Sequence, residues 1–214
     1  MPGVVHVVDD DESFLRAIKR RLSLAGYEVL TYSSAQALLD HLPNEERPSC
    51  ILLDVRLPDL RGPEVQARLN EVGSTVPIVF LTGYADVPTS VKAIKAGAQD
   101  FLVKPVSAEN LLLVIEQALS RHAAERERRE IDNTFRKRMA RLTPREREVF
   151  ERVVKGRMNK QIAYELGTTE RTIKAHRHNV MDKMNVQSLA ELVTLAGRLG
   201  SERQSDPKGR EPSR

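Results

Sequence analysis

Short apolar runs alternate with amphipathic segments through the first half of the chain. Each run holds four or five mostly apolar residues between turn-forming or charged residues, a pattern typical of strands in a parallel sheet. The runs cover residues 4–8, 28–32, 50–54, 77–81 and 100–103, and the amphipathic segments begin near residues 14, 35, 63, 87 and 108. Five strands that alternate with five helices predict a doubly wound parallel α/β domain.

Residues that can carry chemistry stand at the ends of four of these runs. Asp9 and Asp10 follow the first run, Asp54 ends the third, Thr82 follows the fourth and Lys104 follows the fifth. In a parallel sheet the carboxyl ends of the strands meet at one edge. Three close carboxylates repel one another unless a cation lies between them, and oxygen ligands suit Mg²⁺. The pattern predicts a Mg²⁺ site where Asp54 attacks a phosphoryl group whose oxygens Lys104 and Thr82 hold.

These residues also have purely structural interpretations. Asp54, an aspartate that closes a strand, can be a turn former or a helix cap. Asp10 or Asp11 can cap the following helix. Thr82 can belong to a turn, and Lys104 can be a solvated charge before a proline. Four separate strand ends that supply the right residue types for one site favour the functional interpretation.

Charge is distributed unequally along the chain. Residues 1–120 contain 11 Lys and Arg against 16 Asp and Glu, a net charge of −5, whereas residues 121–214 contain 23 against 14, a net charge of +9. An acidic half suits a cation and a basic half suits a polyanion, which predicts two domains with different ligands.

One cysteine, Cys50, excludes an intramolecular disulfide framework and a Cys-based zinc site, and its place in an apolar run predicts a core residue.

No signal peptide follows Met1, and no apolar run approaches the about 18 residues that a membrane span needs. We therefore expect a soluble cytoplasmic protein without a membrane anchor.

The first half of the chain resembles the receiver domain of bacterial response regulators over roughly residues 3–120. The motifs that carry the resemblance are Asp9-Asp10, Leu-Asp54-Val-Arg-Leu-Pro-Asp-Leu-Arg-Gly, Thr82-Gly83 and Phe-Leu-Val-Lys104-Pro105. The resemblance implies a flavodoxin-like fold and a cis peptide bond between Lys104 and Pro105.

The same resemblance implies roles for individual residues. Asp54 is the implied phosphoacceptor, and Mg²⁺ is bound by Asp10, Asp54 and the backbone carbonyl of Arg56. Asp9 takes part in the metal site through water. Phe101 falls on the family's switch aromatic, which acts together with Thr82, although it can also be an ordinary core or edge aromatic.

Residues 121–138 are strongly charged and contain no proline or glycine. Apolar residues at steps of three and four, Ile131, Phe135, Met139 and Leu142, continue a helical stripe. The pattern predicts a helical linker, formed by one long helix or by two helices with a break. A solvated spacer and a dimerising coiled coil are both open, because residues 124–130 lack a sustained apolar seam.

The basic half contains four helical patterns, which begin near residues 144, 159, 170 and 188; the last is expected to end at Leu199. Thr143 caps the first helix, with Pro144 and Glu146 at its first and third positions. The second and third helices, joined by a turn that contains Gly167, predict a helix-turn-helix whose second helix can lie in the DNA major groove. A solvated charged face is the alternative for that second helix.

The basic half resembles the LuxR/NarL-type DNA-binding domain over about residues 138–200. The motifs are Leu-Thr-Pro-Arg-Glu-Arg-Glu-Val, Asn159-Lys-Gln-Ile-Ala163, Leu166-Gly, Thr172-Ile-Lys-Ala-His176 and Lys183-Met-Asn-Val. The whole chain resembles a FixJ-like response regulator, and its DNA-binding motifs are similar to those of the StyR/TodT branch, which controls aromatic-hydrocarbon catabolism. The implied base contacts are Lys174, Ala175 and His178, and the implied phosphate contacts are Lys160, Thr168, Thr172 and Arg177.

The resemblance implies the function of a two-component response regulator. A sensor histidine kinase phosphorylates Asp54, and the phosphorylated protein forms a homodimer that binds double-stranded promoter DNA. Together with RNA polymerase it regulates transcription, with activation as the expected direction. Beyond accepting and hydrolysing its own phosphoryl group, the protein is not expected to be an enzyme.

Two other functions stay open at this point. One is a Mg²⁺-dependent phosphatase, and the other is a phosphorylation-independent DNA-binding regulator whose receiver serves as a protein interaction module. The predicted organisation is a receiver at 1–120, a helical linker at 121–138, a helix-turn-helix domain with four helices at 139–200 and a disordered tail at 201–214.

Overall fold

The computed structural model describes residues 3–43, 46–83 and 97–202. The chain divides into two compact units, residues 1–128 and 129–214. Each unit has its own hydrophobic core. None of the described helices is both long enough and apolar enough to span a membrane.

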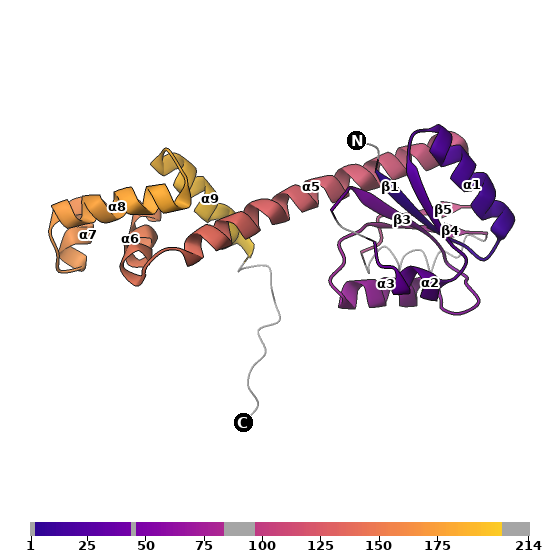
Figure 1. The fold of residues 1–214 in the computed structure, drawn as a ribbon, viewed down its shortest axis with the longest axis horizontal. Helices are drawn as coiled ribbons and strands as arrows, with labels where there is room; N and C mark the ends of the chain where they lie inside the picture. Colours follow the sequence, from indigo (N-terminus) through magenta and orange to yellow (C-terminus); the bar gives the residue numbers. More distant parts are fainter. Residues whose placement is uncertain (1–2, 44–45, 84–96, 203–214) are drawn as a thin grey trace, which may run out of the picture. The chain divides into compact units, whose positions relative to one another are not determined.

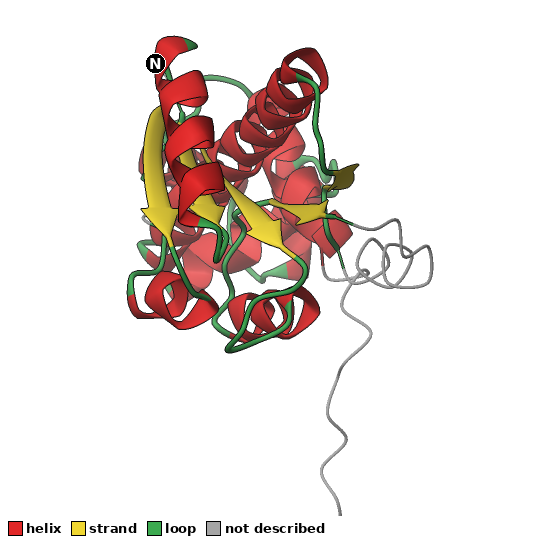
Figure 2. Ribbon diagram, turned by 90° about the vertical axis from the view of Figure 1, so that its right-hand side faces the viewer, coloured by secondary structure: helices red, strands yellow, loops and turns green. Residues whose placement is uncertain are grey.

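The first unit contains a five-stranded sheet. Its strands are β1 (Val4–Val8), β2 (Glu28–Tyr32), β3 (Ser49–Asp54), β4 (Ile78–Thr82) and β5 (Asp100–Val103). All neighbouring pairs are parallel, in the order β2-β1-β3-β4-β5. Figure 2 shows strands of this sheet in yellow, with the helices in red. This arrangement confirms the predicted doubly wound parallel sheet.

Helices cover both faces of this sheet. The described helices of the first unit are α1 (Glu12–Leu24), α2 (Ala35–Asp40), α3 (Gly62–Glu71) and the first part of α5 (Ala108–Ala140). Residues of α1 and α5 pack on one face and those of α2 and α3 on the other (Figure 1). Cys50 is fully buried in the first of these clusters, as expected for a core residue. Most of the helix predicted from residue 87 lies outside the described residues.

Local signals set the ends of two of these helices. The Asp11 carboxylate caps α1 by accepting the N–H groups of Ser13 at 2.8 Å and Phe14 at 3.1 Å. The helix α2 ends at Asp40, three residues before Pro43. A residue before proline is disfavoured in the helical region, so Pro43 prevents the helix from continuing through Leu42.

The second unit is helical. It contains the end of α5 together with α6 (Pro144–Val154), α7 (Asn159–Glu165), α8 (Glu170–Met184) and α9 (Leu189–Glu202). The helix α5 is unbroken from Ala108 to Ala140, which decides between the two forms of linker helix left open by the sequence. Phe135 of α5 lies in the core of the second unit, where its ring centroid is 6.2 Å from that of Phe150.

The beginning and the end of the second unit test two predictions. The capping box of α6 is present, with the Thr143 hydroxyl accepting the N–H of Glu146 and the Glu146 carboxylate accepting the N–H of Thr143. The helix α9 continues through Glu202, so the first two residues of the predicted disordered tail, 201 and 202, belong to this helix. The rest of that tail, residues 203–214, lies outside the described residues.

Candidate functional site

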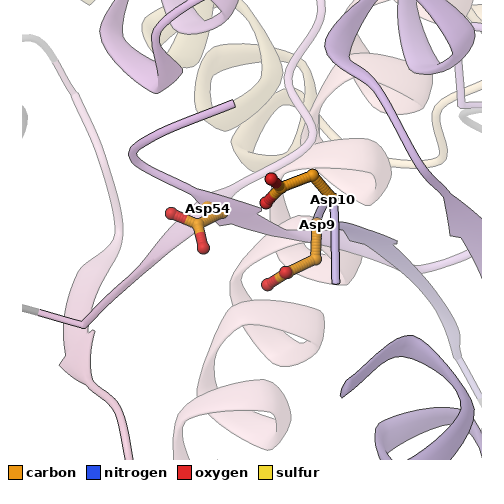
Figure 3. Close-up of side chains that lie close together, drawn as sticks. All are labelled: Asp9, Asp10 and Asp54. Atoms are coloured by element: carbon orange, nitrogen blue, oxygen red, sulfur yellow. The ribbon is translucent and has the colours of Figure 1, made fainter. Parts of the chain in front are cut away.

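Three carboxylates meet at the carboxyl edge of the sheet. Asp9 and Asp10 follow β1 and Asp54 ends β3, the strand paired with β1. Ligand oxygens of the three side chains all lie within 4.8 Å of one another (Figure 3). Asp9 is buried, Asp54 is partly buried and Asp10 is exposed, so the cluster opens to solvent on one side.

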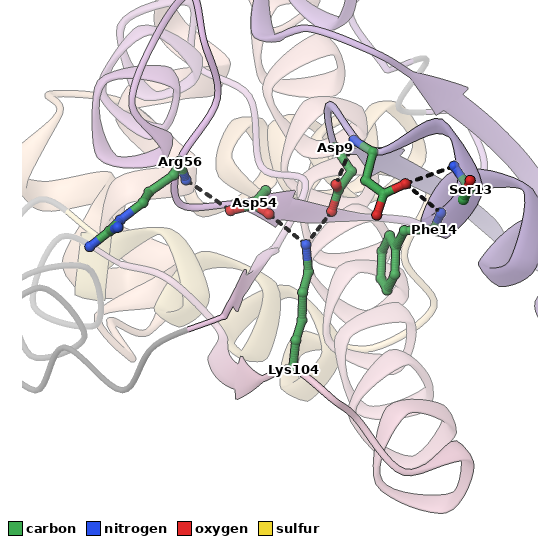
Figure 4. A network of polar contacts seen from close by, with 7 residues as sticks. Asp9, Ser13, Phe14, Asp54, Arg56 and Lys104 are labelled. Carbon is green, nitrogen blue, oxygen red and sulfur yellow. Dashed lines mark hydrogen bonds and ion pairs between the residues drawn. The ribbon is translucent and has the colours of Figure 1, made fainter.

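Lys104 reaches into this cluster from the end of β5. Its ammonium donates to Asp54 Oδ2 at 2.5 Å and also to Asp9 Oδ2 (Figure 4). The exposed fractions of the side chains are 21% for Lys104, 13% for Asp54 and 1% for Asp9. The peptide bond between Lys104 and Pro105 is cis, as the resemblance implied. The ends of β1, β3 and β5 therefore bring the positive charge of Lys104 and the carboxylates of Asp9 and Asp54 together at a site that is largely shielded from solvent.

The environment shifts the pKa values of two of these groups. Burial raises the pKa of Asp9, and the hydrogen bond from Lys104 offsets only part of that shift. Burial acts to lower the pKa of Lys104, but its hydrogen bonds to Asp54 and Asp9 outweigh burial and raise it. Lys104 is therefore held in its charged form, whereas burial makes ionisation of Asp9 less favourable than it is in water.

The loop after β3 completes the surroundings of Asp54. The backbone N–H of Arg56 donates to Asp54 Oδ1 at 2.8 Å, so each carboxylate oxygen of Asp54 accepts one hydrogen bond (Figure 4). Gly62 closes the loop, where its N–H donates to Val55 O at 3.0 Å. A Cβ at Gly62 would lie 2.7 Å from Phe80 Cε1 and 3.0 Å from Asp54 O, which explains why glycine is needed there.

The donor set fits a small hard cation. Carboxylate oxygens on three side chains and the open side of the cluster offer the oxygen and water ligands that Mg²⁺ prefers. A divalent cation would supply the positive charge that favours ionisation of Asp9. Receiver domains of response regulators bind Mg²⁺ through such an acidic cluster.

Thr82 and Phe101 lie on adjacent strands beside this site. Thr82 is 4% exposed, and its backbone carbonyl accepts the N–H of Lys104 at 2.6 Å. Phe101 is partly buried, and its ring centroid is 6.1 Å from that of Phe80 on β4. The β4–β5 pairing sets Phe80 opposite Phe101 and Thr82 opposite Val103.

Two contacts of this site were not predicted from the sequence. The Lys104 ammonium lies 4.4 Å from the ring centroid of Phe14, a cation–π contact that helps to hold it. Asp59 in the loop after β3 accepts N–H groups of Ala35 and Gln36 at the start of α2. Burial acts to raise the pKa of Asp59, but these hydrogen bonds outweigh it and lower the pKa. Helical spacing identifies Phe14 only as an apolar residue, and no local pattern identifies the role of Asp59.

The helices α7 and α8 form the predicted helix-turn-helix. Gly167 in the turn between them has φ +61, a left-handed conformation that favours glycine. The Thr169 hydroxyl caps α8 by accepting the N–H of Thr172 at 3.2 Å. Among the predicted DNA contacts, Lys160, Thr172, Lys174, Ala175 and His178 are exposed, and Thr168 and Arg177 are partly buried.

Arg177 also has a structural contact that the sequence did not predict. Its guanidinium donates to Asn159 Oδ1 at 2.9 Å and thereby joins α8 to the first residue of α7. The hydrogen bond fixes the two helices of the motif relative to each other. The same side chain is among those expected at the DNA backbone.

Two family descriptions match the chain. Residues 5–116 match the response regulator receiver domain, and residues 140–196 match the bacterial regulatory proteins of the luxR family. The chain therefore belongs to the two-component response regulators that join a receiver domain to a LuxR-type DNA-binding domain. Proteins of this class are DNA-binding regulators of transcription rather than catalytic enzymes, and a histidine kinase is the partner that the receiver domain implies.

Individual relatives agree with this assignment over nearly the whole chain. The response regulator protein TodT of Pseudomonas putida is 40% identical over 197 residues, which cover 92% of this chain and 86% of TodT. The transcriptional regulatory protein FixJ of Bradyrhizobium diazoefficiens is 40% identical over 198 residues, 92% of this chain and 96% of FixJ. The solved structure of the response regulator StyR has a TM-score of 0.83 and 43% identity over 92% of this chain and 100% of that one. These relatives confirm the predicted FixJ-like type and its similarity to StyR and TodT.

Proposed function

We propose that Asp54 is the phosphoacceptor of this response regulator. The observation that carries the proposal is the position of its carboxylate, at the carboxyl edge of the sheet, with donors on both oxygens and 13% of the side chain exposed. One oxygen of Asp54 attacks the phosphorus of a phosphohistidine on the sensor kinase. An O–P bond forms as the N–P bond breaks, and the imidazole leaves with the electron pair.

The surrounding residues stabilise the transferred group. Asp10, Asp54 and the Arg56 carbonyl, with Asp9 through water, would hold Mg²⁺, which would supply positive charge to the phosphoryl oxygens. The Lys104 ammonium, which already contacts the Asp54 carboxylate, moves to one phosphoryl oxygen. The Thr82 hydroxyl donates to another. Apart from this transfer and the hydrolysis of its own phosphoryl group, the protein catalyses no reaction.

Phosphorylation changes the balance between two conformations. Thr82 moves toward the phosphoryl group, and Phe101 on the neighbouring strand moves with it. The altered surface near β5 and α5 favours a homodimer. To change a ratio from 1:99 to 99:1, phosphorylation must favour the active conformation by about 5.5 kcal/mol.

The homodimer presents two helix-turn-helix units to promoter DNA. Lys174, Ala175 and His178 on α8 contact bases, and Ala175 can make only an apolar contact such as that with a thymine methyl group. The phosphate contacts are Lys160, Thr168, Thr172 and Arg177. Bound in this way, the regulator acts with RNA polymerase to activate transcription, which places it in the cytoplasm with the chromosome. The functional boundaries we propose are 1–120 for the receiver, 121–138 for the linker and 139–200 for the DNA-binding domain.

Intact-protein mass spectrometry tests the phosphoacceptor. The full chain is incubated with acetyl phosphate and Mg²⁺, and we expect the addition of one phosphoryl group. The Asp54→Asn variant should gain none, whereas Asp40→Asn, which removes a carboxylate from α2, should react like the wild type. Equal modification of wild type and Asp54→Asn would show that another residue is the acceptor.

A further inference from the structure

The tip of the loop between β3 and α3 is tied to another helix by one side chain. Asp59 Oδ1 accepts the N–H of Ala35 at 3.2 Å, and Asp59 Oδ2 accepts the N–H of Gln36 at 2.9 Å. These are the first two residues of α2. Hydrogen bonds from backbone N–H groups to a carboxylate are stronger than those between neutral groups. Asp59 therefore adds a polar link between this loop and the start of α2, which also meet in one apolar cluster through Leu57 and Ala35.

The rest of the loop is fixed at its base. Val55 N donates to Leu81 O at 3.0 Å, and Gly62 N donates to Val55 O at 3.0 Å. Arg56 and Arg61 form an isolated antiparallel bridge across the loop. Within this frame the N–H of Arg56 lies 2.8 Å from Asp54 Oδ1.

We propose that Asp59 is a positioning residue for the metal and phosphoacceptor site. By holding the loop tip on α2, it keeps the Arg56 backbone where its N–H meets Asp54 and where its carbonyl would be available to a bound cation. The inference rests on the proposed Mg²⁺ site. Without Asp59 the loop samples more conformations, and the binding of Mg²⁺ must order it again at an entropic cost.

A matched variant separates this role from the stability of α2. The Ser34 hydroxyl caps the same helix by accepting the N–H of Ala37 at 3.2 Å, and it is not part of the loop. Both Asp59→Ala and Ser34→Ala remove a cap from α2, but only the first releases the loop. Asp59→Asn keeps one oxygen that can accept an N–H group, so it should rescue part of the effect.

The test measures the dissociation constant of Mg²⁺ for the full chain by isothermal titration calorimetry. We expect Asp59→Ala to weaken Mg²⁺ binding about tenfold, as the loss of residues that support metal ligands does. Asp59→Asn should fall between Asp59→Ala and the wild type, and Ser34→Ala should bind Mg²⁺ like the wild type. Wild-type affinity in Asp59→Ala, or an equal loss in Ser34→Ala, would overturn the positioning role while leaving the metal site in place. No binding to the wild type would instead overturn the proposed metal site, and the inference with it.

Discussion

Acid should destabilise the first unit through His6, a buried histidine of β1. His6 is 3% exposed, its Nδ1 lies 3.1 Å from the Tyr32 hydroxyl, and the two rings stack with centroids 5.9 Å apart. Burial lowers the pKa of His6 from 6.5 to about 4, with a smaller opposing effect of Glu28. The folded unit therefore keeps His6 neutral over a pH range in which the unfolded chain has already bound a proton.

The size of the effect follows from the gap between the two pKa values. Well above pH 6.5, His6 is neutral in both the folded and the unfolded chain, so its titration does not reduce the free energy of unfolding. As the pH falls toward 4, the unfolded state gains stability by up to about 1.4 kcal/mol for each pH unit. Over this range the free energy of unfolding should fall by about 3 kcal/mol because of His6.

Urea unfolding followed by NMR signals of the β1 and β3 amides measures this loss for the first unit. The control is His6→Phe, which keeps an aromatic ring and cannot titrate. Other groups titrate alike in both proteins, so the difference in unfolding free energy between them should change by about 3 kcal/mol between pH 6.5 and pH 4. A difference that stays constant with pH would refute the reasoning.

Three substitutions test packing and DNA contacts. Gly62→Ala should lower the unfolding free energy of the first unit by about 1–3 kcal/mol, because its Cβ would lie 2.7 Å from Phe80 Cε1; unchanged urea stability at pH 7 would contradict this. Lys174→Ala should weaken specific DNA binding by about 1–3 kcal/mol and relax the preference for one base pair, which competition among duplexes with single substitutions can measure. Lys160→Ala should weaken binding to all duplexes alike and reduce the slope of log affinity against log salt by about 1. A sequence-selective loss in Lys160→Ala would argue against a phosphate contact.

The sequence predicts the strands better than the helix ends. The central strands β1, β3 and β4 are buried along nearly their whole length, and a strand buried on both faces must be apolar throughout, which makes their sequence runs easy to recognise. Helix ends depend on weaker local effects. The helix α2 stops at Asp40, three residues before Pro43, and α9 passes the predicted end at Leu199 to reach Glu202.

Contacts around the site also differ in how well the sequence predicts them: those between strand ends are predictable, and those made by a loop are not. The hydrogen bond between Lys104 and Asp9 joins residues 95 positions apart, yet it follows from the sequence because both residues stand at strand ends on one edge. The contact of Asp59 with Ala35 spans only 24 positions, but it depends on how a loop folds over the start of a helix. No periodic pattern describes that geometry. The hydrogen bond between Arg177 and Asn159 could not be predicted either, because it depends on how α7 and α8 pack, and the sequence shows only two polar residues of one motif.

The central claim is that phosphorylation of Asp54 controls DNA binding, and fluorescence anisotropy tests it most directly. A labelled duplex is selected from a randomised library with the full chain in Mg²⁺ and beryllofluoride, which mimics a bound phosphoryl group. We expect beryllofluoride to tighten binding of the wild type to this duplex, and Asp54→Asn to lose that response while keeping the weaker basal affinity. Equal affinity with and without beryllofluoride would contradict the account and favour a receiver that acts as a phosphorylation-independent interaction module.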